Sequence, residues 1–282
     1  MLHFTPITRT ELMAAQDLLS TKARQWGYQN LDYLNKPLNL LGSSTKVEKG
    51  HEKRETYIVY LQPANKVSKA TLCIGAQASG CEKPCLISSG HLGMSAGQRK
   101  ATKRTILLLL RPEWFNDKLL SEIDRAEKRA LKTGIPALFR LNGTSDLDWT
   151  HIISARPFSA FYDYTKVLSR VRKNTLSNYH LTFSGSMYSN QSKQALKKAL
   201  SAQFNTVVAY NTKGIKSDNV VRPVGLVDMD KTDLRPLDPK GSLGTLSRKG
   251  SNKIQRAQEG YASFFITKAN IGEFHDIIAS SL

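Results

Sequence analysis

The three cysteines of this chain are grouped within thirteen residues, as Cys73, Cys81 and Cys85. Thiolates gather where a metal ion neutralises their charges, so the C-x7-C-x3-C spacing predicts a metal site. One interpretation is a zinc ion bound by the three thiolates and by His91. The other is a [4Fe–4S] cluster on the three cysteines, with one iron open to a further ligand. Three small buried side chains are the alternative without a metal.

Polar side chains follow five short apolar stretches that have the composition of strands. Parallel α/β folds bind ligands at the carboxyl ends of their strands, so these positions predict a polar site along one edge of a sheet. Helix N-caps use the same residue types, and capping is the alternative for any single position. The positions are Asn142, Thr144, Ser145 and Asp146, then Asp163, Tyr164 and Thr165, then Ser184 and Ser186, then Asn211, then Asp228 and Asp230.

Four of these positions are carboxylates. Asp146, Asp163, Asp228 and Asp230 could hold Mg²⁺ for phosphate chemistry, because hard cations prefer oxygen ligands. The run from Asp228 to Asp233 could equally be a solvated turn. We expect Asp146 and Asp163 on the active face of the sheet.

Two tyrosines flank Asp163, and either Tyr162 or Tyr164 could attack DNA as a nucleophile, as tyrosines do in nicking enzymes. Such enzymes carry a pair of metal-binding histidines on a strand. None of the six histidines forms a His-x-His pair, which favours packing roles for both tyrosines. We nevertheless expect Tyr164 on the active face beside the carboxylates.

Basic residues form two clusters that suit contacts with phosphate groups. A solvated basic helix face is the alternative for each. The first cluster follows the cysteines and the second follows Asp163. They contain Arg99, Lys100, Lys103 and Arg104, then Lys166, Arg170, Arg172 and Lys173.

The charge of the whole chain predicts an acidic partner. The 282 residues include 41 Lys and Arg against 23 Asp and Glu, a formal net charge of +18. Neutralising phosphates releases counterions, so we expect nucleic acid as the partner, DNA before RNA. No lipidation motif or amphipathic anchor is visible, and the longest apolar run, Ile106 to Leu110, is too short to span a bilayer. A membrane partner is therefore not expected.

The start of the chain, Met1 to Ile7, lacks the charged and apolar stretches of a signal peptide. Three cysteines cannot all pair, which favours a reducing compartment. We therefore expect a cytoplasmic protein, in the host cell if a phage encodes it.

The first half of the chain predicts helices and strands in a mixed order. Thr8 and Glu11 have capping-box spacing, and an apolar face then predicts a helix that ends at Gly27. A polar, basic loop is expected next, from Gly42 to Arg54. The further predictions are strands over Thr56–Leu61 and Lys69–Gly75, a helix from a capping pair at Ser95 and Gln98 to Leu110, and a helix from Pro112 with a core face of Phe115, Leu119, Ile123, Ala126 and Ala130.

The second half predicts strands that alternate with helices, which implies parallel pairing. Residues 211–223 are too polar for a helix, so we expect an α/β fold with a mostly parallel sheet, an incomplete or irregular barrel. Residues 230–260 read as loop, and a final helix is expected over Asn270–Ser281. The predicted domains are residues 1–55, a helix and basic loop, and residues 56–282, the barrel-like core. The expected strands are Pro136–Leu141, Ser159–Tyr164, Tyr179–Phe183, Thr206–Tyr210 and Val224–Val227.

Two strings, Arg140–Asp146 (RLNGTSD) and Phe161–Lys166 (FYDYTK), carry a resemblance to a known family. With the cysteine loop, the basic helix after it and the Ser184-Gly185-Ser186 strand end, they resemble phage-encoded proteins related to the gene product eighty-eight family over about residues 40 to 250. The resemblance implies a phage or prophage origin and a barrel-like fold, but no established reaction. Relatives often carry further cysteines near the C-terminus, and this chain has none after Cys85.

Three hypotheses follow for function. The first is a phage enzyme or accessory protein that acts on or beside nucleic acid, with a metal or Fe–S site at the cysteines. The second is a phage DNA replication protein that binds or nicks its origin. The third is a non-enzymatic nucleic-acid-binding protein in which zinc only holds the cysteine loop together.

Overall fold

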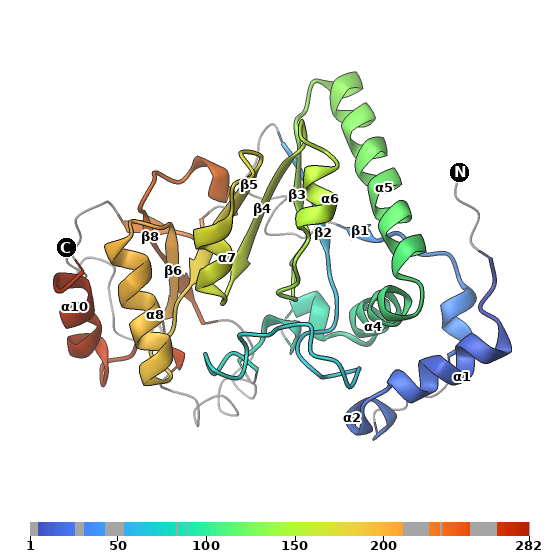
Figure 1. Ribbon diagram of the computed structural model, residues 1–282, viewed down its shortest axis with the longest axis horizontal. Helices are drawn as coiled ribbons and strands as arrows, with labels where there is room; N and C mark the ends of the chain where they lie inside the picture. Colours follow the sequence, from blue (N-terminus) through green and yellow to red (C-terminus); the bar gives the residue numbers. More distant parts are fainter. Residues whose placement is uncertain are drawn as a thin grey trace.

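A computed structural model of the chain describes residues 5–25, 31–42, 54–82, 84–88, 90–210, 226–231, 233–248 and 264–281. Its centre is an eight-stranded sheet in the order β1-β2-β3-β4-β5-β6-β8-β7, which is not closed into a barrel (Figure 1). All neighbouring strands are parallel except β1 and β2. The expected α/β fold with a mostly parallel, incomplete barrel-like sheet is thereby confirmed.

The strands are β1 (Leu41–Gly42), β2 (Glu55–Val59), β3 (Ala137–Arg140), β4 (Ala160–Thr165), β5 (Tyr179–Ser184), β6 (Thr206–Tyr210), β7 (Leu226–Asp228) and β8 (Leu243–Ser247). The α-helices are α1 (Arg9–Leu18), α2 (Thr21–Gln25), α4 (Ser95–Leu110), α5 (Pro112–Thr133), α6 (Thr150–Ser154), α7 (Leu168–Lys173), α8 (Asn190–Ser201) and α10 (Ile271–Ala279). Short 3-10 helices are η1 (Asp32–Asn35), η2 (Leu86–Ser88), η3 (Gly90–Gly93) and η5 (Arg235–Leu237).

One face of the sheet, here the outer face, is covered by α5, α6, α7 and α8 (Figure 1). From β2 to β6 each strand lies next to the one before it, and the order always advances in the same direction. Right-handed crossovers therefore place all these connecting helices on the same side. The resulting core packs Phe139 and Phe161 of the sheet against Phe115 of α5 and Trp149 before α6.

The other face, here the inner face, is crossed by the connection from β7 to β8, residues 229–242. β8 lies between β6 and β7, so this step runs backwards along the sheet, and a right-handed crossover must pass over the opposite face. Leu234 of the connection packs on Leu138 and Tyr162 there. The inner face is thus covered by irregular chain and the short 3-10 helix η5 rather than by an α-helix.

The N-terminal segment packs into the same core as the sheet. Ile7, Ala15 and Leu19 belong to the cluster that contains Phe115 and Phe139. The capping box predicted at the start of α1 is present, because Thr8 accepts from the Glu11 N–H and Glu11 accepts from the Thr8 N–H. Glu11 also accepts two hydrogen bonds from Arg111, at the junction of α4 and α5.

Several local predictions were wrong in ways that backbone contacts explain. No strand forms over Lys69–Gly75, where only the isolated bridge of Cys73 with Asp146 gives a sheet-like contact. The first helix breaks at Leu19 and Ser20, because the Leu18 carbonyl oxygen accepts from the Lys69 N–H and Ser20 donates to the carbonyl oxygens of Val67 and Lys66. Residues 230–260 are not all loop, since β8 lies within them. The predicted helix end at Gly27, the loop of residues 43–53 and residues 211–225 lie outside the described residues.

Two helix starts also differ from the prediction. α4 begins at Ser95, but its N-cap is Met94, whose side chain makes no capping bond. The sequence predicts Asn190 as the cap of the helix that follows β5, but α8 is capped by Ser189, which exchanges hydrogen bonds with Ser192. The start of α5 at Pro112 and the burial of Phe115, Leu119, Ile123 and Ala126 on it are confirmed.

Within the described ranges, no helix combines the length and the apolar character that crossing a bilayer requires.

Candidate functional site

The segment from Cys73 to Cys85 lies along the carboxyl-end edge of the sheet, below the strand ends in Figure 1. Backbone and hydroxyl groups hold it there. Cys73 forms a parallel bridge with Asp146, which follows β3, and the Cys73 Sγ lies 3.7 Å from the Thr144 carbonyl oxygen. Ser186, after β5, donates to the Ser79 carbonyl oxygen over 2.9 Å. The cysteine segment therefore spans the ends of β3, β4 and β5.

The three thiols are half-buried and unpaired. Burial raises the pKa of Cys73 to about 12 and that of Cys85 to about 11. Cys81 adds to both increases, so the three groups lie within electrostatic range of one another. Burial also raises the pKa of Cys81, while the nearby Lys166 ammonium lowers it. Without a bound cation the thiols therefore stay protonated at neutral pH.

In the part of the chain that the structure describes, no three side chains of His, Cys, Asp or Glu are grouped as a metal ion requires. The side chain of His91 lies outside the described residues. The cysteines therefore suit a metal by their chemical type, because soft thiolate ligands bind zinc and iron–sulfur clusters. The described side chains do not form a complete coordination shell.

Asn142 organises the loop that follows β3. Its side-chain oxygen accepts from the Ser145 hydroxyl, the Leu147 N–H and the Trp149 indole N–H at 2.9, 2.9 and 3.2 Å. Its side-chain nitrogen donates to the Leu147 carbonyl oxygen over 3.0 Å. These bonds close the loop on itself, so the predicted polar positions Asn142 and Ser145 serve the loop itself.

Asp163 is fully buried on the outer face, under this loop. Its carboxylate accepts from the Asn142 backbone N–H at 2.8 Å and from the Tyr179 hydroxyl at 3.1 Å. Burial raises the pKa of Asp163 to about 7, although these donors and Arg140 act in the opposite direction. Asp163 therefore changes charge near neutral pH inside the fold.

Asp146 joins the cysteine segment to the start of α7. It accepts from the Lys166 backbone N–H at 2.8 Å and forms an ion pair with Arg170. Burial raises its pKa, and the Lys166 N–H and Arg170 lower it. Arg170 also donates to the Leu147 carbonyl oxygen. The carboxylate is thus held by donors from the residue after β4 and from α7.

Lys166 brings a positive charge to the thiols. Its Nζ lies 4.7 Å above the Phe264 ring and 3.5 Å from the Gly185 carbonyl oxygen. Burial lowers its pKa, while Cys81 and Asp146 raise it. Lys166, Cys81 and Asp146 are therefore the predicted site residues that the structure brings together most directly.

Tyr164 lies on the opposite face of β4 from Asp163, because successive side chains of a strand alternate. On the inner face its ring stacks under the Arg140 guanidinium at 4.8 Å, and its hydroxyl points to Asp233 at 3.4 Å. Tyr162 is fully buried and also donates to Asp233, at 3.2 Å. The pKa values of both tyrosines are raised, chiefly by burial. The predicted active residues Asp146, Asp163 and Tyr164 are thus not on one face.

Arg140 and Asp233 were not among the predicted site residues. Arg140 ends β3, and its guanidinium forms a 3.0 Å ion pair with Asp233 of the β7–β8 connection. The sequence signal was the arginine inside an apolar strand, since a charged side chain in that position must find a partner. Its partner lies too far along the chain for any local pattern to identify.

The predicted basic clusters divide into exposed and internally bonded residues. Lys103 and Arg104 are buried and donate to the carbonyl oxygens of Lys36 and Asn39. Burial lowers the pKa of Lys103 to about 8. Lys166 and Arg170 have the partners given above. The exposed members are Arg99, Lys100, Arg172 and Lys173.

The last two predicted carboxylates form a turn after β7. Asp228 accepts from the Asp230 N–H at 3.0 Å, and Asp230 accepts from the Ser247 N–H at 2.6 Å. Asp228 is exposed. Asn211, the remaining predicted position, lies outside the described residues.

Comparison with known proteins gives one match. The family described as Gene product 88 matches over residues 34–263. No curated protein matches the chain, and no solved structure matches it. The matched region contains the whole cysteine segment and every described strand of the sheet.

Proposed function

This chain belongs to the Gene product 88 family, a family of phage-type gene products, and on that premise we propose that it acts on or beside nucleic acid through a cysteine centre. The observation that carries the proposal is the position of the segment from Cys73 to Cys85. It lies across the carboxyl ends of three parallel strands, which is where α/β folds assemble their ligand sites.

The nucleic-acid part of the proposal is supported by charge. The formal net charge of +18 means that basic side chains repel one another in the folded chain. Binding to an acidic polymer would reduce that repulsion. Binding would release counterions and would therefore weaken steeply as the salt concentration rises.

The metal part of the proposal assigns Cys73, Cys81 and Cys85 as ligands, with His91 as the fourth if the metal is zinc. Zinc would hold the segment in place, and an iron–sulfur cluster would supply an electron carrier. Lys166 and Arg170 would offset the negative charge of thiolates at this edge. Lys166 already lowers the pKa of Cys81.

The test is metal analysis and an ultraviolet–visible spectrum of protein purified without oxygen, beside Cys81→Ala. Iron, sulfide and a brown absorbance that the variant loses would support a cluster. One zinc per chain, lost in the variant, would support a structural zinc and a non-enzymatic binding protein.

The matched control is Ser79→Ala. Ser79 lies in the same segment and donates to the Gly75 carbonyl oxygen, but it supplies no thiolate. The control should keep the metal. No metal in the unmodified protein, or equal loss in both variants, would overturn the assignment of these cysteines as ligands.

A further inference from the structure

One long segment in the middle of the sheet contains no acidic residue. From Tyr164 to Tyr210 the chain contains no Asp and no Glu. This stretch covers α7, β5, α8 and β6. Its seven basic residues are Lys166, Arg170, Arg172, Lys173, Lys193, Lys197 and Lys198, so it contributes +7 of the net charge of +18.

Three of the seven already interact with other residues of the chain. Lys166 lies by Cys81 and Phe264, Arg170 pairs with Asp146, and Lys193 pairs with Glu273 of α10 at 2.7 Å. The other four are exposed, and none forms an ion pair with another described residue. They are Arg172 and Lys173 on α7, and Lys197 and Lys198 on α8.

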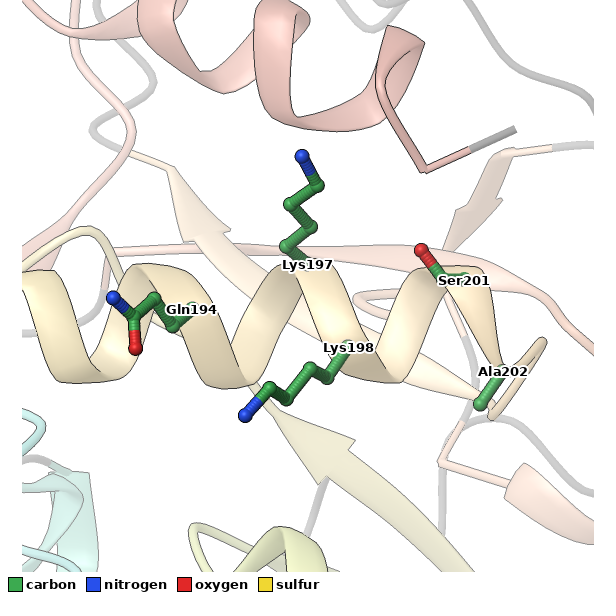
Figure 2. A pocket seen from close by; sticks show the side chains of 5 residues that line it. All are labelled: Gln194, Lys197, Lys198, Ser201 and Ala202. Carbon is green, nitrogen blue, oxygen red and sulfur yellow. The ribbon is translucent and has the colours of Figure 1, made fainter.

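These four charges lie on two helices that cover the outer face of the sheet. α7 and α8 lie side by side on the outer face, on either side of β5 (Figure 1). An open depression of about 490 Å³ lies against α8, lined by Gln194, Lys197, Lys198, Ser201 and Ala202. Figure 2 shows the two lysines extending from opposite sides of the helix, with Gln194 and Ser201 beside them. Lysines and neutral hydrogen-bonding side chains are the groups that contact phosphate oxygens.

Helix α5, on the same face of the sheet, shows that not every helix there lacks acidic residues. Its five basic residues are interleaved with five acids, Glu113, Asp117, Glu122, Asp124 and Glu127. Cations at the ends of α7 and α8 also complement the helix dipoles, but that effect does not require the absence of acids over the whole stretch. The unopposed charge of α7 and α8 therefore fits a polyanion.

We propose that α7 and α8 form the surface that binds the phosphate backbone of duplex DNA. Neither helix carries an aromatic residue, so neither offers a platform on which unpaired bases could stack. Long basic side chains on adjacent helices instead suit a regular backbone. This inference rests on the proposed nucleic-acid function and adds the place of contact.

The test measures binding to a random-sequence DNA duplex over a series of salt concentrations, for the unmodified chain and for R172Q/K173Q/K197Q/K198Q. Each lost phosphate contact reduces the slope of log affinity against log salt by about 0.9, so the slope should fall by about 3 to 4. Affinity at low salt should fall about tenfold or more.

The matched pair is K197Q/K198Q against K128Q/K132Q, which removes the same charge from exposed positions of α5. Only the α8 pair should reduce the slope, by about 2. If the unmodified chain binds no nucleic acid, the proposed function fails. If it binds and both pairs weaken it equally, or R99Q/K100Q alone weakens it, the assignment to α7 and α8 fails. Tighter binding to duplex RNA than to duplex DNA would overturn the choice of DNA.

Discussion

Asp163 and Asn142 form a buried polar pair in which nearly every group finds a partner. The backbone N–H and the side-chain nitrogen of Asn142 both donate to Asp163, and its side chain also bonds within its own loop. Removing one partner from such a network leaves the other buried without its bond, which costs more than the bond itself contributes. These residues therefore stabilise the loop on which the cysteine segment rests.

The raised pKa of Asp163 predicts how stability depends on pH. The pKa is 3.8 in an unstructured chain and about 7 in the fold. The folded state thus binds more protons between these values, so stability falls as pH rises from about 4 to 7 and levels off above that. Urea unfolding should show that the stability of the unmodified chain, relative to Asp163→Asn, falls by roughly 2 to 4 kcal/mol over this range.

Asp148 provides a control of opposite sign. Its pKa is lowered by hydrogen bonds from Thr150, so it contributes stability above the pKa of the unfolded chain and loses it as pH falls. Asp148→Asn should therefore destabilise the protein at neutral pH, and the difference from the unmodified chain should shrink as the pH falls below the pKa of the unfolded chain. A pH-independent difference between Asp163→Asn and the unmodified chain would contradict a carboxyl that titrates near neutrality.

At the scale of elements, the loop after β3 passes very close to β2. A Cβ added to Gly143 would lie 2.6 Å from Ile58 Cγ2 and 2.7 Å from the Val59 carbonyl oxygen. The Gly143 N–H donates to that same carbonyl oxygen over 3.0 Å. Only glycine lets the two backbones approach this far, and the approach aligns Asp146 with Cys73.

We expect Gly143→Ala to destabilise the protein by about 1 to 3 kcal/mol, because the contact is with backbone that cannot move aside. Gly272 in α10 is the matched control, since a Cβ there meets no atom within 4 Å. Gly272→Ala should be neutral or stabilise by up to about 1 kcal/mol. Thermal unfolding followed by circular dichroism measures both. Equal effects of the two substitutions would show that the loop and β2 are not in close contact.

At the scale of the whole molecule, the β7–β8 connection ties the end of the sheet to its middle. Asp233 receives the Arg140 guanidinium and two tyrosine hydroxyls from β3 and β4. The pair is almost fully buried, with 13% and 4% of the two side chains exposed. Since a buried charge needs its partner, this pair determines where the connection crosses the inner face.

A double-mutant cycle tests the contribution of the Arg140–Asp233 ion pair. Arg140→Met removes the cation that forms the 3.0 Å ion pair with the buried Asp233 and should cost about 3 to 5 kcal/mol. Adding Asp233→Asn should recover part of that loss, so the two effects should differ from their sum by about 1 to 3 kcal/mol in urea unfolding.

The pair of Arg156 with Asp124 is the comparison, because its side chains are 29% and 45% exposed. Its coupling should be below about 1 kcal/mol. Additive effects at Arg140 and Asp233 would mean that the connection is held by its apolar contacts alone.

The sequence by itself determined the elements whose signals are local. Pro112 with the apolar spacing from Phe115 marks α5, the Thr8–Glu11 pair marks α1, and alternating strands and helices imply a parallel sheet. Each of these signals spans only a short part of the sequence, since it depends on helix periodicity, capping or β-branched content. The chain also shows where its cysteines gather, but not what surrounds them.

Only the tertiary structure decided which polar side chains are exposed and which are bonded inside the protein. Lys103 and Arg104 have the composition of a solvated cluster, yet they reach backbone carbonyls more than sixty residues earlier in the chain. β8 lacks a strand-like composition and forms because β6 and β7 pair with it on both sides. Arg140 meets Asp233 across 93 residues. A side chain's partner depends on chain crossings that no local pattern records, because hydrogen bonds and burial act through space rather than along the sequence.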